Sequence, residues 1–180
     1  ESVFKAFAKT FKKAIAVDPD LKNSAKILET LALNGVDIIE LGIPFSDPIS
    51  DGPTIQKATE RALKNNVNID DSLRLIEDFR LKYQTPIILF GYFNPFLQYG
   101  LKKVMKSIKK SGGNGVLIVD LPPEEAEETQ NAVNEAGIEL VYLLAPTSTE
   151  KRIKMVSKLS NSFIYLVSVT GVTGARRALD

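Results

Sequence analysis

The chain has 180 residues, 44% of them hydrophobic, and its 23 basic and 22 acidic side chains give a net charge of +1. This composition fits one globular domain and offers no basic surface for nucleic acid. Because cysteine and histidine are both absent from the sequence, disulfides, thiol chemistry, histidine metal sites and histidine-based triads are excluded. No apolar run approaches the roughly 18 residues that cross a bilayer, and residues 1–14 predict a short amphipathic helix rather than a secretory signal.

Short runs rich in Val, Ile and Leu alternate with amphipathic stretches along the chain. Most of the runs are apolar throughout, which is typical of parallel strands buried on both faces. We expect six strands, at Ala14–Val17, Val36–Leu41, Pro86–Tyr92, Gly115–Leu121, Glu139–Leu144 and Phe163–Val169. The helices expected between them are Leu21–Asn34, Thr54–Lys64, Asp70–Tyr83, Leu101–Ser111, Glu124–Ala136 and Thr149–Leu159.

Residues at the ends of these helices support the assignment. Asp70 is the expected N-cap of its helix. Gly35, Gly112 and Gly137 stand where helices are expected to end.

The spacing of the strands indicates an α/β fold. Apart from one longer interval, strands start about every 24 to 29 residues, which is typical of βα units. Six such units fit either an open doubly wound sheet or part of a TIM (β/α)8 barrel. A doubly wound nucleotide binder should carry a Gly-rich turn after its first strand, and "AIAVDPDLKN" does not. The sequence therefore favours the barrel.

In such a barrel the functional face lies at the carboxyl ends of the strands. Many polar or aromatic residues fall there in the predicted elements. They are Asp18, Asp20, Glu40, Asp47, Asp51, Tyr92, Asn94, Asp120 and the segment from Tyr165 to Thr173.

Glu40 and Asp51 form the most informative pair. Glu40 follows "VDII" and precedes "LG", so we expect desolvation to raise its pKa and let it act as an acid near neutral pH. Asp51 lies in a polar loop, where we expect it to stay ionised and serve as a base. The alternative is structural: Glu40 would form a salt bridge, and Asp51 would be only a turn residue before Gly52.

The other candidates have simpler structural readings. Asp47 precedes a proline and is expected to form a turn. Asp120 is expected to cap the helix that follows it rather than to orient a loop, and the rings of Tyr92 and Tyr165 are more often packing residues. The Gly-rich segment 171–175, "GVTGA", offers backbone N–H groups that suit a phosphate.

The segment "ELGIPFSDPISDGPTIQ", residues 40–56, closely resembles the most specific motif of the tryptophan synthase alpha chain family. Further segments agree with the same family in the same order. They are "VDPDL", "PIILFGYFNPFLQYG", "GVLIVDLPPEEAEE", "LLAPTSTEKRI" and "FIYLVSVTGVTGAR". The resemblance covers essentially all 180 residues and implies the TIM barrel.

The resemblance implies a carbon–carbon lyase of tryptophan biosynthesis, which cleaves indole-3-glycerol phosphate to indole and glyceraldehyde 3-phosphate. The reaction is a retro-aldol cleavage that needs neither metal nor Schiff base. Glu40 would protonate indole C3 and help to remove the glycerol hydroxyl proton, while Asp51 would hold or accept the indole N–H proton. Phe90, Tyr92 and Leu117 would surround the indole. Tyr165 would support Glu40, and Thr173 would support Asp51. Gly174 would lie at the phosphate.

The resemblance also implies a partner. This is a pyridoxal-phosphate-dependent beta chain, which receives indole through a tunnel in an alpha2-beta2 heterotetramer. The alpha chain itself would need no cofactor, would bind neither nucleic acid nor membrane, and would be cytoplasmic. Loops around Pro44–Ile55 and Gly171–Ala178 would close on the small phosphate substrate and report its presence to the partner.

Two departures from the family pattern leave an alternative open. The segment "KKAIAVDPDL" makes the first strand several residues short, and Asp180 falls within the loop after the sixth strand. Since an eight-stranded barrel takes about 250 residues, we expect residues 1–180 to be a single (β/α) barrel domain that lacks strands 7 and 8. The alternative to an enzyme is then a truncated or degenerate alpha chain that binds the beta chain without catalysis. A sugar-phosphate epimerase is disfavoured because histidines and metal-ligand clusters are absent from the sequence.

Overall fold

The computed structural model describes residues 21–167, which form five parallel strands in the sheet order β1-β2-β3-β4-β5. Each strand pairs with the next one along the chain. Their bounds are β1 (Ile39–Gly42), β2 (Ile87–Gly91), β3 (Gly115–Ile118), β4 (Glu139–Leu144) and β5 (Ile164–Leu166). The strand order never reverses, as it would at the switch point of a doubly wound sheet.

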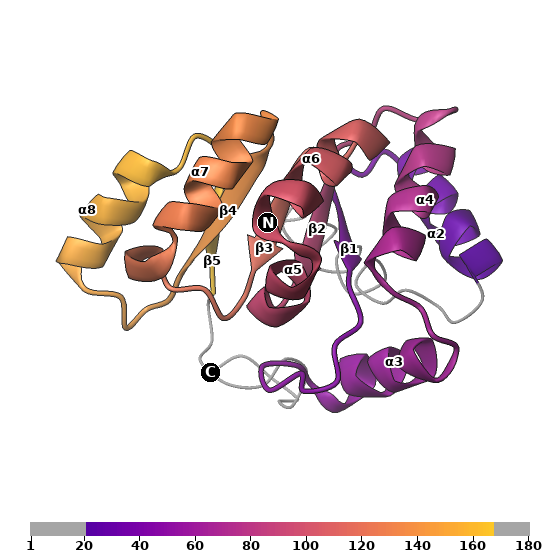
Figure 1. Ribbon diagram of the computed structural model, residues 1–180, viewed down its shortest axis with the longest axis horizontal. Coiled ribbons are helices and arrows are strands. Elements are labelled where there is room, and N and C mark those ends of the chain that lie inside the picture. Colours follow the sequence, from indigo (N-terminus) through magenta and orange to yellow (C-terminus); the bar gives the residue numbers. More distant parts are fainter. Residues whose placement is uncertain (1–20, 168–180) are drawn as a thin grey trace.

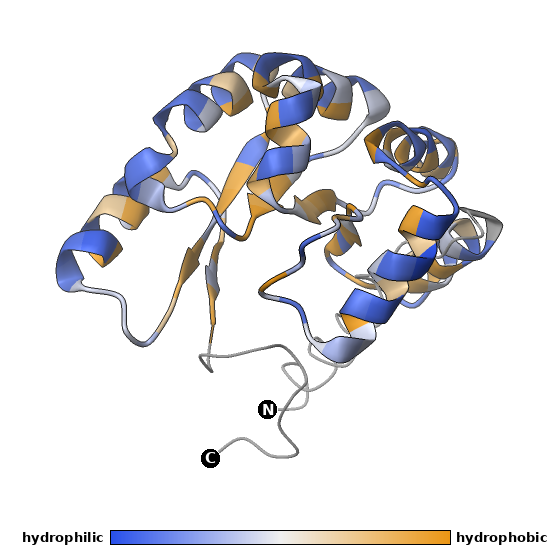
Figure 2. Ribbon diagram, turned by 60° about the horizontal axis from the view of Figure 1, so that its bottom comes forward, coloured by the Kyte–Doolittle hydropathy of each residue, from blue (hydrophilic) through white to orange (hydrophobic). Residues whose placement is uncertain are grey.

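Most helices form an outer arc along one side of this sheet, and α3 (Pro53–Lys64) lies apart from the arc, beyond the carboxyl end of β1 (Figures 1 and 2). The other helices are α2 (Leu21–Leu33), α4 (Ile69–Arg80), α5 (Phe93–Tyr99), α6 (Leu101–Ser111), the 3₁₀ turn η1 (Pro123–Glu125), α7 (Glu127–Ala136) and α8 (Glu150–Leu159). Neighbouring helices contact one another around the arc, α2 with α4, α4 with α6, and α6 with α7. The described part of the chain is therefore a section of a TIM barrel, which confirms the predicted fold class.

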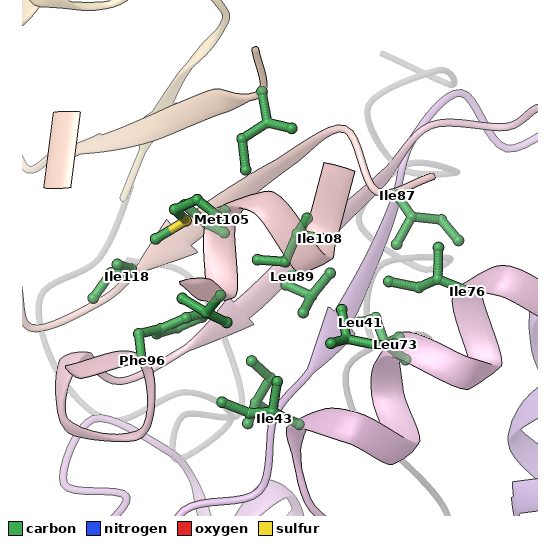
Figure 3. Packing of buried hydrophobic residues seen from close by; sticks show 14 of the residues in the cluster. Leu41, Ile43, Leu73, Ile76, Ile87, Leu89, Phe96, Met105, Ile108 and Ile118 are labelled. Carbon is green, nitrogen blue, oxygen red and sulfur yellow. The ribbon is translucent and has the colours of Figure 1, made fainter. Parts of the chain in front are cut away.

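The two faces of the sheet have different partners. Alternate residues such as Leu41 and Leu89 point towards the helices, where they pack with Ile76, Phe96 and Ile108 (Figure 3). The residues between them point to the other face, which is the interior of the barrel. A second, smaller apolar cluster lies there, built around Ile88, Leu117 and Val141. The register aligns these interior residues, with Glu40 opposite Ile88 and Phe90 opposite Leu117.

The strands predicted within the described residues are all present, and most are shorter than expected. The strand predicted at Val36–Leu41 begins only at Ile39, because the Val36 N–H bonds back to the Leu31 carbonyl and closes the end of α2. The first predicted strand, Ala14–Val17, lies outside the described residues.

The helix predictions need three corrections. α5 was not expected, because its short sequence "FNPFLQY" contains a proline, yet its Phe96 side chain is completely buried. The predicted helix from Glu124 is divided into η1 and α7. The N-cap of α4 is Asn68 rather than Asp70: the Asn68 side chain accepts from the N–H of Asp71, whose carboxylate accepts the N–H of Asn68.

The glycines predicted at helix ends do stand there. All three have a positive φ, +73° for Gly35, +90° for Gly112 and +67° for Gly137.

Arg80 ties together the amino-terminal ends of two strands. Its guanidinium donates to the carbonyls of Gly112 (2.7 Å), Tyr83 (3.1 Å) and Thr85 (2.7 Å), and to Oδ1 of Asn114 (2.8 Å). The same Asn114 oxygen accepts the N–H of Ile87 at the start of β2. One side chain thus satisfies several backbone acceptors at the end of the barrel opposite the predicted site.

We predict that Arg80→Met lowers the free energy of unfolding by about 2 to 4 kcal/mol, since it leaves partly buried carbonyls without a donor. The control is Arg74→Met, which removes a 70% exposed side chain paired with Asp71. That change should cost no more than about 0.5 kcal/mol. Urea unfolding of the two variants measures both values, and equal effects would refute the role of Arg80.

Candidate active site

Glu40 is a carboxylic acid inside an apolar strand. It lies in the middle of β1, where the pleat turns it to the barrel interior while Ile39 and Leu41 face the helices. Its side chain is 1% exposed, and neither carboxylate oxygen has a hydrogen-bond partner among residues 21–167. This burial raises the pKa of Glu40 from 4.5 to about 8, as the sequence predicted. The alternative of a salt bridge to Glu40 finds no support in the described part of the chain.

Tyr165 lies near Glu40. Burial, together with the negative charge of Glu40, raises the pKa of the Tyr165 hydroxyl to about 12. Tyr165 packs in the interior cluster with Phe90 and Leu117, which is completely buried. Three predicted substrate-site residues from three strands therefore meet on the face that carries Glu40.

Asp51 reaches the site from the loop between β1 and α3. Its N–H bonds to the Pro48 carbonyl, and its own carbonyl accepts from the Gln56 side chain at 2.8 Å, so the loop is held on the first turn of α3. Asp51 is 7% exposed. Burial raises the pKa of its carboxyl group, while hydrogen bonding with the Tyr92 side chain opposes the increase. Asp51 lies in the predicted loop, where Tyr92 and the walls of the site enclose its carboxyl group. Its role as an ionised base stays a prediction.

Tyr92 joins the two halves of the site. It follows β2, is 2% exposed, and its hydroxyl accepts the N–H of Ser50 at 3.0 Å. Its ring lies against Phe45, with centroids 5.1 Å apart. Asp51, Phe90 and Tyr92 line one small cavity of about 20 Å³, whose other walls are residues of β1, β2, α3 and the segment directly after β1. The structure therefore brings these three predicted residues together at the carboxyl ends of β1 and β2.

The remaining sequence candidates divide into two groups. Asp47 accepts a hydrogen bond from the Ser46 hydroxyl, which fits its predicted role in a turn. Asp120 does not cap the helix that follows it: its carboxylate accepts the N–H of Phe93 at 2.7 Å, at the start of α5. This correction follows from the unexpected α5, whose amino terminus lies beside the end of β3. Asp18, Asp20, Thr173, Gly174 and the segment 171–178 lie outside the described residues.

Sequence reasoning included three residues at this end of the barrel only as members of the Pro44–Ile55 loop and gave them no individual role. Ser50 contributes its backbone N–H, a role that no side-chain pattern reveals. Phe45 covers Tyr92, and Ile55 lines the cavity from α3. The only available signal was their position within residues 40–56.

Residues 21–167 offer neither a metal site nor a membrane-spanning helix. No group of three His, Cys, Asp or Glu side chains in this region has the arrangement of a metal site. No helix there is long and apolar enough to span a membrane.

The sequence and the fold both match known proteins. Residues 10–180 match the family model described as tryptophan synthase alpha chain. The chain belongs to this family. The tryptophan synthase alpha chain of Geotalea uraniireducens (strain Rf4) is 46% identical over 99% of this chain and 68% of its own length. That of Geobacter sp. (strain M21) is 47% identical over 91% of this chain and 61% of its own length.

Solved structures of the alpha chain agree with the fold. The tryptophan synthase subunit alpha of Legionella pneumophila str. Paris superposes with a TM-score of 0.83 at 35% identity, covering 90% of this chain and 67% of that one. A structure of the tryptophan synthase a2b2 complex from Pyrococcus furiosus gives 0.82 at 41% identity, covering 89% and 64%. The chain spans about two thirds of the length of these alpha chains. The family predicted from residues 40–56 is confirmed.

We predict that burial of Glu40 makes the stability of this alpha chain depend on pH. The folded protein holds the Glu40 proton up to about pH 8. In the unfolded chain Glu40 has the ordinary pKa of 4.5, so the proton is released at lower pH. Stability that is fully present below pH 4.5 is therefore lost as the pH rises through about 8. Glu40→Gln removes this loss. The gain in unfolding free energy of the variant over the parent should grow between pH 5 and 8, by at most roughly 4 kcal/mol, since each pH unit contributes about 1.36 kcal/mol.

Urea unfolding at several pH values measures this difference. The control is Glu60→Gln, which changes an exposed carboxylate on α3 and should leave the pH profile of the parent unchanged. Parallel profiles for the parent and Glu40→Gln would show that Glu40 titrates normally.

Proposed function

We propose that this alpha chain cleaves indole-3-glycerol phosphate to indole and glyceraldehyde 3-phosphate, which is the function of its family. The observation that supports this most directly is the pair of enclosed carboxyl groups at one end of the barrel. Glu40 is held at a pKa of about 8 on the interior face, and Asp51 lies at the mouth beside Tyr92. Two carboxyl groups in different environments can divide the roles of acid and base.

Glu40 is the proposed acid. With a pKa of about 8, most of it carries a proton at pH 7 and can donate this proton to indole C3. The ionised carboxylate then accepts the proton of the glycerol hydroxyl group next to the ring. The carbon–carbon bond breaks, its electron pair returns to the protonated indole ring, and the hydroxyl carbon becomes the aldehyde. The proton given to C3 is balanced by the one taken from the hydroxyl group, so the acid is regenerated.

Asp51 is the proposed partner of the indole N–H group. Protonation at C3 places positive charge on the ring nitrogen, and an ionised carboxylate stabilises that charge by accepting or holding the N–H proton. Phe90, Tyr92 and Leu117 would enclose the indole, and Tyr165 would support Glu40. Thr173 would support Asp51, and Gly174 would bind the phosphate.

The partner and the setting of the chain belong to the same proposal. The Pyrococcus furiosus relative occurs in a complex named tryptophan synthase a2b2, which supports a beta-chain partner in an alpha2-beta2 heterotetramer. In this assignment, pyridoxal phosphate is bound by the beta chain, and the alpha chain works without a cofactor because two carboxyl groups supply its proton transfers. We also propose that residues 1–180 belong to one (β/α) barrel domain and that the protein is cytoplasmic, as a biosynthetic enzyme.

Substitution of either carboxyl group tests the mechanism. Asp51→Asn and Glu40→Gln should each lower the rate of indole release by about 10² to 10⁴-fold, the range typical of a lost acid–base group, and leave the protein folded. Indole formed from indole-3-glycerol phosphate measures the rate, and circular dichroism checks the fold. Asp78→Asn, an exposed change on α4, should keep the parental rate.

Full activity in Asp51→Asn would remove Asp51 from the mechanism, and a parental rate in Glu40→Gln would refute the acid role. The alternative function, binding of the beta chain without catalysis, gives a different result. The parent protein would then stimulate a beta chain without releasing indole.

The pH dependence of indole release provides a second test. Because the acid must be protonated, kcat/KM should fall as the pH rises through about 8. Because Asp51 must be ionised, kcat/KM should also fall on the acidic side. A profile that stays flat between pH 7 and 10 would contradict the assignment of Glu40.

A further inference from the structure

Asp120 lies at the end of β3 but is bonded to the segment that follows β2. Its carboxylate Oδ1 accepts the backbone N–H of Phe93 at 2.7 Å. Phe93 is the first residue of α5, and the N-cap position before it is Tyr92, whose own side chain makes no capping hydrogen bond. Asp120 therefore satisfies a free N–H group at the start of α5 from another part of the chain. The residue that it holds is covalently next to Tyr92.

Tyr92 in turn holds the loop that carries Asp51. Its hydroxyl accepts the N–H of Ser50 at 3.0 Å, and its ring packs on Phe45. Ser50 directly precedes Asp51, so both ends of the Ser50–Asp51 unit depend on the position of Tyr92. Two hydrogen bonds thus connect Asp120 with the loop, through the adjacent residues Phe93 and Tyr92.

The junction between β2 and α5 is tightly packed, so a displacement of the start of α5 is passed on to Tyr92. A Cβ atom at Gly91 would lie 3.2 Å from Cε2 of Phe96 and 3.4 Å from Cβ of Ile43. α5 therefore sits directly on the end of β2, and a change in its start moves Tyr92. The other end of α5 has a separate anchor, the Tyr99 hydroxyl, which donates to Oδ1 of Asp70 at 2.6 Å. That anchor provides a matched control.

We propose that Asp120 is a positioning residue for Asp51: it fixes the start of α5 and thereby the Tyr92 hydroxyl that holds the Ser50–Asp51 loop. Asp120 acts here without touching the substrate. The assignment of a catalytic consequence rests on the proposed function, but the structural link between Asp120 and Ser50 does not.

Amide hydrogen exchange followed by NMR tests the link without any activity. Asp120→Ala should speed the exchange of the Phe93 amide and also of the remote Ser50 amide, the latter to the level seen in Tyr92→Phe. Asp120→Asn keeps a carbonyl oxygen that can accept the Phe93 N–H, so both amides should again be protected from exchange as in the parent. Tyr99→Phe loosens the other end of α5 and should leave Ser50 unchanged. If the Phe93 amide exchanges faster in Asp120→Ala while the Ser50 amide exchanges at the parental rate, the proposal is wrong.

Kinetics of indole release then test the consequence. Asp120→Ala should lower kcat by about tenfold with KM within about twofold, since a misplaced catalytic group affects the chemical step more than binding. Asp120→Asn should recover to within about threefold of the parent. In the Tyr92→Phe background, Asp120→Ala should add little, because both changes act on one contact.

Different results would refute the positioning role of Asp120 and the proposed function of the protein. Independent, multiplying effects of Asp120→Ala and Tyr92→Phe on kcat would overturn the positioning role. A parent protein that releases no indole would refute the proposed function, and the exchange of Ser50 would still decide whether Asp120 holds the loop.

Discussion

The burial of the Glu40 carboxyl group is the constraint on which the rest of the site depends. A carboxylate that leaves water without a compensating partner is unstable in its charged form, so the protein keeps the proton to about pH 8. Pleating fixes this environment, since one residue of shift along β1 would exchange Glu40 for Leu41 and direct the carboxyl group into the helix layer. The register of β1 on β2, with Glu40 opposite Ile88, is therefore also what specifies the acid.

The barrel separates stability from chemistry along its axis. At the amino-terminal end, Arg80 binds several backbone acceptors and joins the starts of β2 and β3. Towards the carboxyl end, Tyr92 and Asp120 make hydrogen bonds, but the buried carboxyl group of Glu40 has no partner within residues 21–167. This one unsatisfied group lies on the face where a reaction can use it.

Much of this arrangement could be predicted from sequence. Continuous apolar runs predicted the parallel strands, and "VDIIELG" alone was enough to predict a buried acid in β1. The environment of Asp51 could not be predicted, because it is created by Tyr92 from a distant part of the chain. α5 was missed for the same reason. Its seven residues are too few to show a helical period, and its start is capped by Asp120 from beyond β3 rather than by a neighbouring residue.

The two carboxyl groups also differ in how the fold holds them, and this difference has a mechanistic meaning. Glu40 is fixed by a strand within the sheet, so its position changes only if the sheet changes. Asp51 is held by a loop that depends on Tyr92, and Tyr92 depends on the start of α5. A residue at the end of such a chain of contacts keeps its position only while every contact in the chain is kept. The fold thus combines an acid of fixed position with a second group that contacts outside the sheet can adjust.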